Sequence, residues 1–316
     1  MRLVKPRLIR SRVGLASWGI LSIGIYGGIY GGISLWGTPS LGLASESENI
    51  MNSQSLASWV GESPENASGF ILIAHGLNLK PSRMLPLAQT LCHASNGQTP
   101  RGLACRILVL QGHEEDSPSQ MRQVSAQSWK NTILAEIRAL QAMAGERPIH
   151  FLGFSLGALV GAWGLQQFEE SPFQKMALIA PPLETRGYVR LAALIPGPGS
   201  WTLPSKNHPE YRANDRTSLA AYRALFEIQD EVRSGNPLRL NIDTRVWVSP
   251  KDELVSAKKL AKKAGSAGWT QWSIQNVDSI EPTLRPTYHH LLIDEASMGH
   301  KAWQEMQRTL EKHFGI

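Results

Sequence analysis

The chain has 316 residues, 42% of them hydrophobic, and a formal net charge of +6. This is enough apolar material for one large core or two small ones. Five basic residues and no acidic residue occupy the first twelve positions, and the rest of the chain has 27 basic against 26 acidic residues. A nucleic-acid-binding domain carries its basic charge as a patch on the folded domain. The charge distribution therefore argues against nucleic acid as a partner.

Residues 1–44 have the composition of a signal peptide or a membrane anchor. No charged residue occurs between positions 13 and 36. A spanning helix needs about 20 mainly apolar residues, and a signal peptide needs a basic start, an apolar stretch and small residues at a cleavage site. Ala44, in the sequence Gly42-Leu43-Ala44, fits such a cleavage site. Both alternatives predict export to the periplasm or the cell exterior, with residues 13–36 contacting the membrane while they remain attached.

The chain has two cysteines, Cys92 and Cys105. Neither their spacing nor a neighbouring cluster of histidines or cysteines indicates a metal site. We expect no metal and no cofactor. In an oxidising compartment the two thiols could close a short loop, but two unlinked thiols fit the sequence equally well.

Polar and Ser-rich residues fill positions 45–67, which we interpret as a lead-in. Beyond it, runs that are almost entirely apolar alternate with helical patterns, as expected for a parallel sheet covered on both faces. This alternation predicts a doubly wound α/β domain over residues 68–316. The expected strands are 69–74, 106–110, 148–152, 175–179, 245–248 and 272–277. The expected helices are 82–93, 123–144, 156–168 and one from about Asp294 to the C-terminus.

Residues 183–239 interrupt the alternation of strands and helices. A loop of this length without structure is implausible in a compact domain, and residues 217–232 have a helical pattern. We therefore expect a small helical cap that selects the acyl chain and contributes little to the chemical step. Four aromatic residues of the cap could line an acyl pocket or form the cap's own core: Trp201, Tyr211, Tyr222 and Phe226.

The segment Gly153-Phe154-Ser155-Leu156-Gly157 matches the pattern G-x-S-x-G. The match follows an expected strand and opens an expected helix, which is the setting in which a nucleophilic serine is exposed on a tight turn. Side chains in place of the two glycines would clash where the chain reverses. A serine hydroxyl is a weak nucleophile at its free pKa, so it requires a neighbouring base.

Three further segments follow expected strands in a suitable order. His75-Gly76-Leu77 precedes the serine, Lys251-Asp252-Glu253 follows it, and Tyr288-His289-His290 comes just before the last expected helix. The order serine, acid, histidine is that of α/β-hydrolases. Since neighbouring residues of an extended segment point to opposite sides, only one of the two histidines can face the serine.

Residues 68–316 resemble the α/β-hydrolase superfamily, in particular monoacylglycerol lipases, carboxylesterases and serine-aminopeptidase-like hydrolases. The resemblance rests on the segments ILIAHGLN, GFSLGA, SPKDELVS and YHHLLIDE. The H-G-x-G-x-S segment of these proteins is degraded here to residues 111–117, QGHEEDS.

The resemblance implies a catalytic triad with Ser155 as nucleophile and Asp252 as acid, since it places the acid three residues before a valine; Glu253 is the alternative acid. It favours His289 over His290 as the base, because Asp294 stands five residues after His289. The backbone N–H groups of two leucines, Leu77 and Leu156, would stabilise the oxyanion.

The expected activity is cofactor-free hydrolysis of a small-molecule carboxylic ester through an acyl-enzyme. A peptidase or a thioesterase would use the same residues, and a non-catalytic binding protein could retain the fold. His75 is expected to orient its turn rather than act as a base. His113 and the acidic run that follows it are expected to form a solvated loop rather than a metal site.

Overall fold

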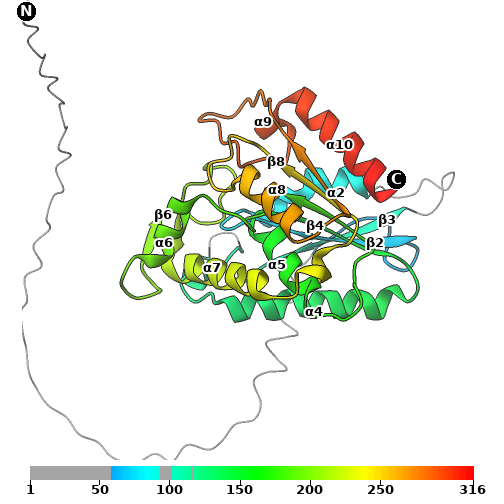
Figure 1. Ribbon diagram of the computed structural model, residues 1–316, viewed down its shortest axis with the longest axis horizontal. Helices are drawn as coiled ribbons and strands as arrows, with labels where there is room; N and C mark the ends of the chain where they lie inside the picture. The colour runs from blue at the N-terminus through cyan, green and yellow to red at the C-terminus, as the bar shows by residue number, and fades with distance from the viewer. Residues whose placement is uncertain (1–57, 93–101, 115–116) are drawn as a thin grey trace, which may run out of the picture. The chain divides into compact units, whose positions relative to one another are not determined.

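The computed structural model describes residues 58–92, 102–114 and 117–316. Its centre is a seven-stranded sheet with the strand order β1-β3-β2-β4-β5-β8-β9 (Figure 1). β1 pairs antiparallel with β3, and the other strands run parallel to their neighbours. The strands are β1 (Ser58–Gly61), β2 (Gly69–Ala74), β3 (Leu103–Leu108), β4 (Ile149–Phe154), β5 (Lys175–Ile179), β8 (Thr244–Val248) and β9 (Trp272–Asn276). The predicted doubly wound, mostly parallel sheet is confirmed.

The central strands β2 and β4 are buried at every position. Successive side chains of a strand point to opposite faces. Accordingly, Phe70 and Leu72 of β2 belong to one apolar core, whereas Ile71 and Ile73 belong to the other. This arrangement explains why these strands are apolar at almost every position, with the buried His150 of β4 as the exception, rather than alternating.

Helices cover both faces of the sheet (Figure 1). The buried residues of α4 (Ala126–Ala144), α5 (Leu156–Leu165) and α8 (Ala257–Ser266) share a core with Phe70. Those of α2 (Leu85–Leu91) and α10 (His300–Phe314) lie in the opposite core with Ile71. Short helices complete the body of the domain: η1 (Pro81–Met84), α3 (Pro118–Met121) and α9 (Glu295–Met298).

The edge strand β1 was not expected, because its sequence SWVG lies in the polar segment that we interpreted as a lead-in. Its pairing with β3 is supported by Trp59, whose ring lies 6.0 Å from that of Phe70 and 5.2 Å from the guanidinium of Arg106. A single aromatic side chain that packs on the core thus stabilises a strand that has no apolar run of its own.

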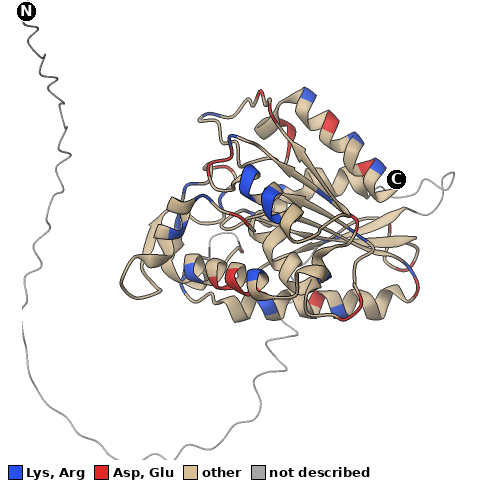
Figure 2. Cartoon of the chain, in the orientation of Figure 1, with Lys and Arg blue, Asp and Glu red and all other residues tan. Residues whose placement is uncertain are grey.

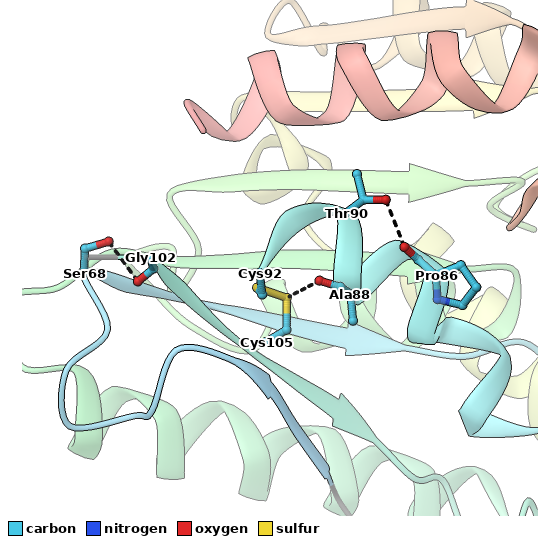
Figure 3. The surroundings of a disulfide bond; sticks show 7 residues. All are labelled: Ser68, Pro86, Ala88, Thr90, Cys92, Gly102 and Cys105. Carbon is cyan, nitrogen blue, oxygen red and sulfur yellow. Dashed lines mark hydrogen bonds between the residues drawn. A yellow bond between two sulfur atoms is a disulfide. The ribbon is translucent and has the colours of Figure 1, made fainter. Parts of the chain in front are cut away.

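Cys92 and Cys105 form a disulfide bond. Figure 3 shows Cys92 directly after α2 and Cys105 on β3. Both residues are buried, so the bond ties α2 to an inner strand of the sheet. The structure thereby decides between the two alternatives that the sequence left open.

The cap lies between β5 and β8 and combines helices with a hairpin. α7 (Leu219–Ser234) packs beside α4 and α5, and the indole N–H of Trp163 on α5 donates to the Oε2 of Glu231 on α7 at 2.7 Å. The hairpin was not expected; its strands pair antiparallel, with Thr202 opposite Ser218. The elements of the cap are η2 (Gly187–Arg190), α6 (Leu191–Leu194), β6 (Thr202–Pro204), β7 (Arg216–Ser218), α7 (Leu219–Ser234) and η3 (Pro237–Leu240).

α7 and α10 each carry charged side chains of both signs (Figure 2). α8 differs, because it carries four lysines and no acidic residue. Its apolar side, with Leu260 and Ala264, faces the core, so the lysines form its solvated face.

The apolar segment 13–36 and the cleavage site at Ala44 lie outside the described residues, and both stay predictions. Among residues 58–92, 102–114 and 117–316, no helix combines the length and the hydropathy needed to cross a membrane.

Candidate active site

Ser155 lies on the turn between β4 and α5. Its backbone has φ 50° and ψ −117°, a region that costs energy for any residue with a Cβ atom. Two hydrogen bonds hold this conformation: the N–H of Ser155 donates to the C=O of Ile179 at 2.9 Å, and its C=O accepts from Leu159 at 3.1 Å. The serine is therefore fixed at the carboxyl end of the central strand.

The two glycines of the motif allow this turn to pack closely. A Cβ atom on Gly157 would lie 2.1 Å from the carbonyl oxygen of Ala74, and one on Gly153 would lie 2.6 Å from the Cα of Ala158. The expected steric reason for both glycines is confirmed. Because Gly157 touches the end of β2, the nucleophile turn lies directly beside the turn that follows β2.

The structure brings Ser155 together with His290 and Asp252. The Nε2 atom of His290 lies 2.9 Å from the Oγ of Ser155, and its Nδ1 lies 2.8 Å from the Oδ2 of Asp252. A carboxylate only accepts hydrogen bonds, so the ring proton resides on Nδ1 and Nε2 accepts from the serine hydroxyl. This is the tautomer that a general base requires.

His289, which we favoured, does not contact Ser155. Its Nδ1 instead lies 3.3 Å from the Oε1 of Glu253. His290 thus replaces His289 in the predicted arrangement. The preference for His289, which rested on the spacing to Asp294, was wrong because Asp294 has a different role. It caps α9 by accepting from the N–H of Ser297 at 2.8 Å.

Asp252 is fully buried, with a side-chain exposure of 0%. Its Oδ1 accepts from the N–H groups of Leu254 at 2.7 Å and Val255 at 2.8 Å. Burial raises the pKa of Asp252, but the interaction with His290 and the two backbone hydrogen bonds together hold this pKa below its ordinary value. A carboxylate at this position is therefore ionised at neutral pH.

Glu253, the alternative acid, supports the histidine loop instead. Its carboxylate accepts from the backbone N–H of His289 at 2.9 Å and from that of His290 at 3.0 Å. One acidic side chain thereby fixes two consecutive peptide groups. No pattern in the sequence indicated this role, since the two segments lie 36 residues apart.

The two expected oxyanion donors lie on adjoining turns. Leu156 is the first residue of α5, so its N–H has no acceptor within the helix. Leu77 follows Gly76, and a Cβ atom on this glycine would lie 3.4 Å from the Cβ of Ser155. Within the described residues, neither N–H donates a hydrogen bond. Both are thus available to a ligand beside the serine.

His75 is buried behind the turn. Its Nδ1 donates to the C=O of Gly76 at 2.9 Å, and its Nε2 accepts from the N–H of Leu110 at 3.1 Å. Burial lowers the pKa of His75 to about 4, so the ring stays neutral. It connects the ends of β2 and β3, which agrees with the expected orienting role.

His113 is also fully buried and does not belong to a solvated loop, contrary to our expectation. Its ring lies 4.5 Å from that of His75 and 5.9 Å from that of Trp129, and burial lowers its pKa well below the ordinary value. The described part of the chain contains no group of three or more His, Cys, Asp or Glu residues suited to a metal ion.

A cavity of about 230 Å³ opens beside His290. Its walls combine apolar and polar residues from the cap and from the body of the domain: Phe154, Tyr188, Lys206, Asn207, His208, Glu253, Leu254, Tyr288, His290 and Leu291. None of the four aromatic residues that we considered for an acyl pocket lines this cavity. Trp201 is 58% exposed, whereas Phe226 and Tyr211 are buried within the domain.

Comparison with solved structures finds lipases and esterases of the same fold. A metagenome-derived lipolytic enzyme aligns over 82% of this chain and 97% of its own, with 20% identity and a TM-score of 0.59. The monoacylglycerol lipase of Paleococcus ferrophilus aligns over 81% of this chain and 98% of its own, with 16% identity and a TM-score of 0.57.

A monoglyceride lipase of Saccharomyces cerevisiae, solved with a substrate analogue, aligns over 81% of this chain and 91% of its own. The identity is 9% and the TM-score is 0.61. No protein-family model matches the chain. No curated protein is significantly similar to it. The structural likeness confirms the predicted α/β-hydrolase fold, and the residues themselves must carry any argument about function.

Proposed function

We propose that this protein is a serine hydrolase that cleaves a carboxylic ester through an acyl-enzyme. The observation that carries the proposal is the hydrogen-bonded series Ser155–His290–Asp252 on a strained turn after the central strand. A serine, a base and a group that orients the base within hydrogen-bonding reach are the signature of nucleophilic catalysis. The arrangement therefore favours an enzyme over a protein that only binds ligands.

The proposed reaction begins when Nε2 of His290 takes the hydroxyl proton of Ser155 while Oγ attacks the ester carbonyl carbon. The carbonyl oxygen becomes an oxyanion, which the N–H groups of Leu77 and Leu156 stabilise. Ionised Asp252 keeps the imidazolium in place. The imidazolium then gives its proton to the alcohol as the bond between the carbonyl carbon and the alcohol oxygen breaks.

Water resolves the acyl-enzyme by the same steps in the second half of the reaction. His290 removes a proton from the water, the resulting hydroxide attacks the acyl carbon, and the proton returns to Oγ of Ser155 as the acid departs. Both half-reactions need only the three side chains and the two N–H groups. The proposed reaction therefore requires no cofactor.

The cavity beside His290 suits an apolar part of the ester, because Phe154, Tyr188, Leu254 and Leu291 are among the residues that line it. Its volume of about 230 Å³ favours a compact group over a long chain. The structural neighbours named above are lipases and esterases, which supports an ester rather than an amide as the substrate.

The test is a series of nitrophenyl esters of increasing acyl length, run in parallel with peptide amides and thioesters on the domain from residue 45 onward. Ester turnover that disappears in Ser155→Ala supports the proposal. Faster turnover of amides or thioesters would favour a peptidase or a thioesterase. Absence of turnover on all three classes would favour a binding protein.

We further propose that the chain is exported, as its basic and apolar N-terminus predicts. A buried disulfide persists most readily in an oxidising compartment, which supports this view. A reporter fused after residue 60 should be active outside the cytoplasm, whereas activity only in the cytoplasm would refute export. N-terminal sequencing of the mature protein then distinguishes cleavage at Ala44 from a retained anchor.

A further inference from the structure

The turn that carries Leu77 is hydrogen-bonded extensively to the cap. The Nδ2 of Asn207 donates to two consecutive carbonyl groups, that of Leu77 at 2.9 Å and that of Asn78 at 2.8 Å. The N–H of Ala213 also donates to the carbonyl of Asn78, at 3.1 Å. Two peptide groups directly after the expected oxyanion donor are thereby held from the cap.

The side chain of Asn78 completes a reciprocal pair with the cap. Its Nδ2 donates to the C=O of Asn214 at 2.8 Å and to the Oγ1 of Thr217 at 2.9 Å, while its Oδ1 accepts from the N–H of Asn214 at 2.8 Å. Asn78 is 1% exposed and has φ 51°. Asparagine tolerates this left-handed conformation better than most residues.

The cap residues that bond to Leu77 and Asn78 all lie within residues 205–217, which we call the strap. The strap is itself fixed to the body of the domain at several points. The C=O of Tyr211 accepts from the N–H of Lys80 at 2.8 Å, and its hydroxyl donates to Asp294 at 2.7 Å. The Nδ2 of Asn214 donates to the C=O of Gly112 at 3.0 Å. The strap is therefore held in place by hydrogen bonds to the body of the domain.

We propose that Asn207 and Asn78 are positioning residues that aim the N–H of Leu77 at the oxyanion, so that the cap takes part in the chemical step. This inference rests on the proposed esterase function. It also departs from the expectation that the cap only selects the acyl chain. Neither asparagine hydrogen-bonds to Ser155 or His290, and both would act on the oxyanion through the backbone of Leu77. Asn207 in addition lines the cavity beside His290.

The geometry explains how the side chain of Asn207 can control the orientation of the N–H of Leu77. The N–H of Leu77 and the C=O of Leu77 belong to adjoining peptide groups, so rotation of the second group moves the first. Asn207 holds the second group and the one after it with a single amide nitrogen. Removing an oxyanion donor typically costs about 10² to 10³ in kcat, and a displacement of about 1 Å can cost about 10².

The test compares Asn207→Ala with Asn207→Asp in the same protein. Asn207→Ala removes the Nδ2 donor. Asn207→Asp keeps nearly the same side-chain volume but replaces the donor by a carboxylate oxygen, which repels the carbonyl oxygens of Leu77 and Asn78. Each variant should lower kcat per active site by about 10- to 100-fold. Because Asn207 also lines the cavity beside His290, any change in KM is measured separately from this loss. Active sites are counted by titration with a fluorophosphonate, so that misfolded protein does not lower the measured kcat.

The decisive readout is the inhibition constant of a trifluoromethyl ketone, which forms an oxyanion when the serine adds to it. This constant should rise by the same factor by which kcat/KM falls. Asn241→Ala is the matched control. Asn241 makes comparable hydrogen bonds to Thr270 and Gln271. It lies just before β8, at the amino ends of the parallel strands, whereas the site lies at their carboxyl ends. It should leave both quantities unchanged.

Unchanged kcat and unchanged ketone affinity in both Asn207 variants would overturn the inference. So would a fall in kcat without weaker ketone binding, since the oxyanion would then be held as before. A wild-type protein that hydrolyses no ester would instead refute the proposed function. The two failures are distinguishable because Ser155→Ala is measured alongside.

Discussion

The two adjacent histidines offer a comparison in which residue type and sequence position are nearly the same. His290→Ala removes a ring that contacts both Ser155 and Asp252. Loss of the base from such a triad should lower kcat by at least about 10³, equivalent to about 4 kcal/mol of transition-state stabilisation. The damage should be confined to turnover, because Glu253 still holds the backbone of the loop.

His289→Ala should behave quite differently. The ring makes one contact of 3.3 Å with Glu253, and both side chains are partly exposed. An exposed pair of this kind is worth less than about 1 kcal/mol, so kcat should fall by less than about fivefold. The backbone N–H of residue 289 remains in the variant and still donates to the carboxylate.

The assay is the steady-state hydrolysis of a short nitrophenyl ester by both variants, with melting temperatures recorded to exclude unfolding. We expect a difference of at least about 200-fold in kcat between the two variants. Equal losses would show that the observed pairing of His290 with Ser155 does not determine catalysis. A larger loss in His289→Ala would restore the preference based on sequence alone.

Three further predictions concern the supports of the site and of the fold. Glu253→Ala should lower kcat by about 10-fold, because the loop that carries His290 loses its acceptor; an unchanged kcat would refute that support. Burial lowers the pKa of two histidines, His75 and the buried His150 of β4, to about 4, below the unfolded value of 6.5, so both rings are neutral in the folded and the unfolded protein at neutral pH and the folded state is not penalised there. As pH falls from 6.5 through about 4, the unfolded protein binds protons at these rings and the folded protein does not, so the free energy of unfolding decreases. Calorimetry should therefore detect proton uptake on unfolding in this range. A melting temperature independent of pH would contradict this. Replacement of Cys92 and Cys105 by Ala should lower the stability by about 3 kcal/mol and the melting temperature by about 6–12 °C, whereas an unchanged melting temperature would mean that the bond contributes nothing.

Much of the sheet and of the nucleophile turn could be predicted because their determinants are local in sequence. Apolar runs identified the buried strands, and the two glycines at positions 153 and 157 have steric reasons that any close turn shares. The edge strand β1 could not be found in this way. It depends on Trp59 packing against Phe70, and no periodic pattern in the sequence predicts this contact.

The choice between the histidines could not be made locally either. Sequence alternation requires only that one ring faces the serine. Which one does so depends on the conformation of the loop, and Glu253 fixes that conformation from 36 residues away. The supports of the oxyanion turn are more distant still, since Asn207 and Leu77 are separated by 130 residues.

The proposed function depends above all on Ser155 being an activated nucleophile. The most direct measurement is mass-spectrometric mapping of the adduct formed with a fluorophosphonate on the folded protein. We expect one adduct per chain, on Ser155, and no adduct in Ser155→Ala. An unlabelled wild-type protein, or labelling of the alanine variant at the same level, would contradict this assignment.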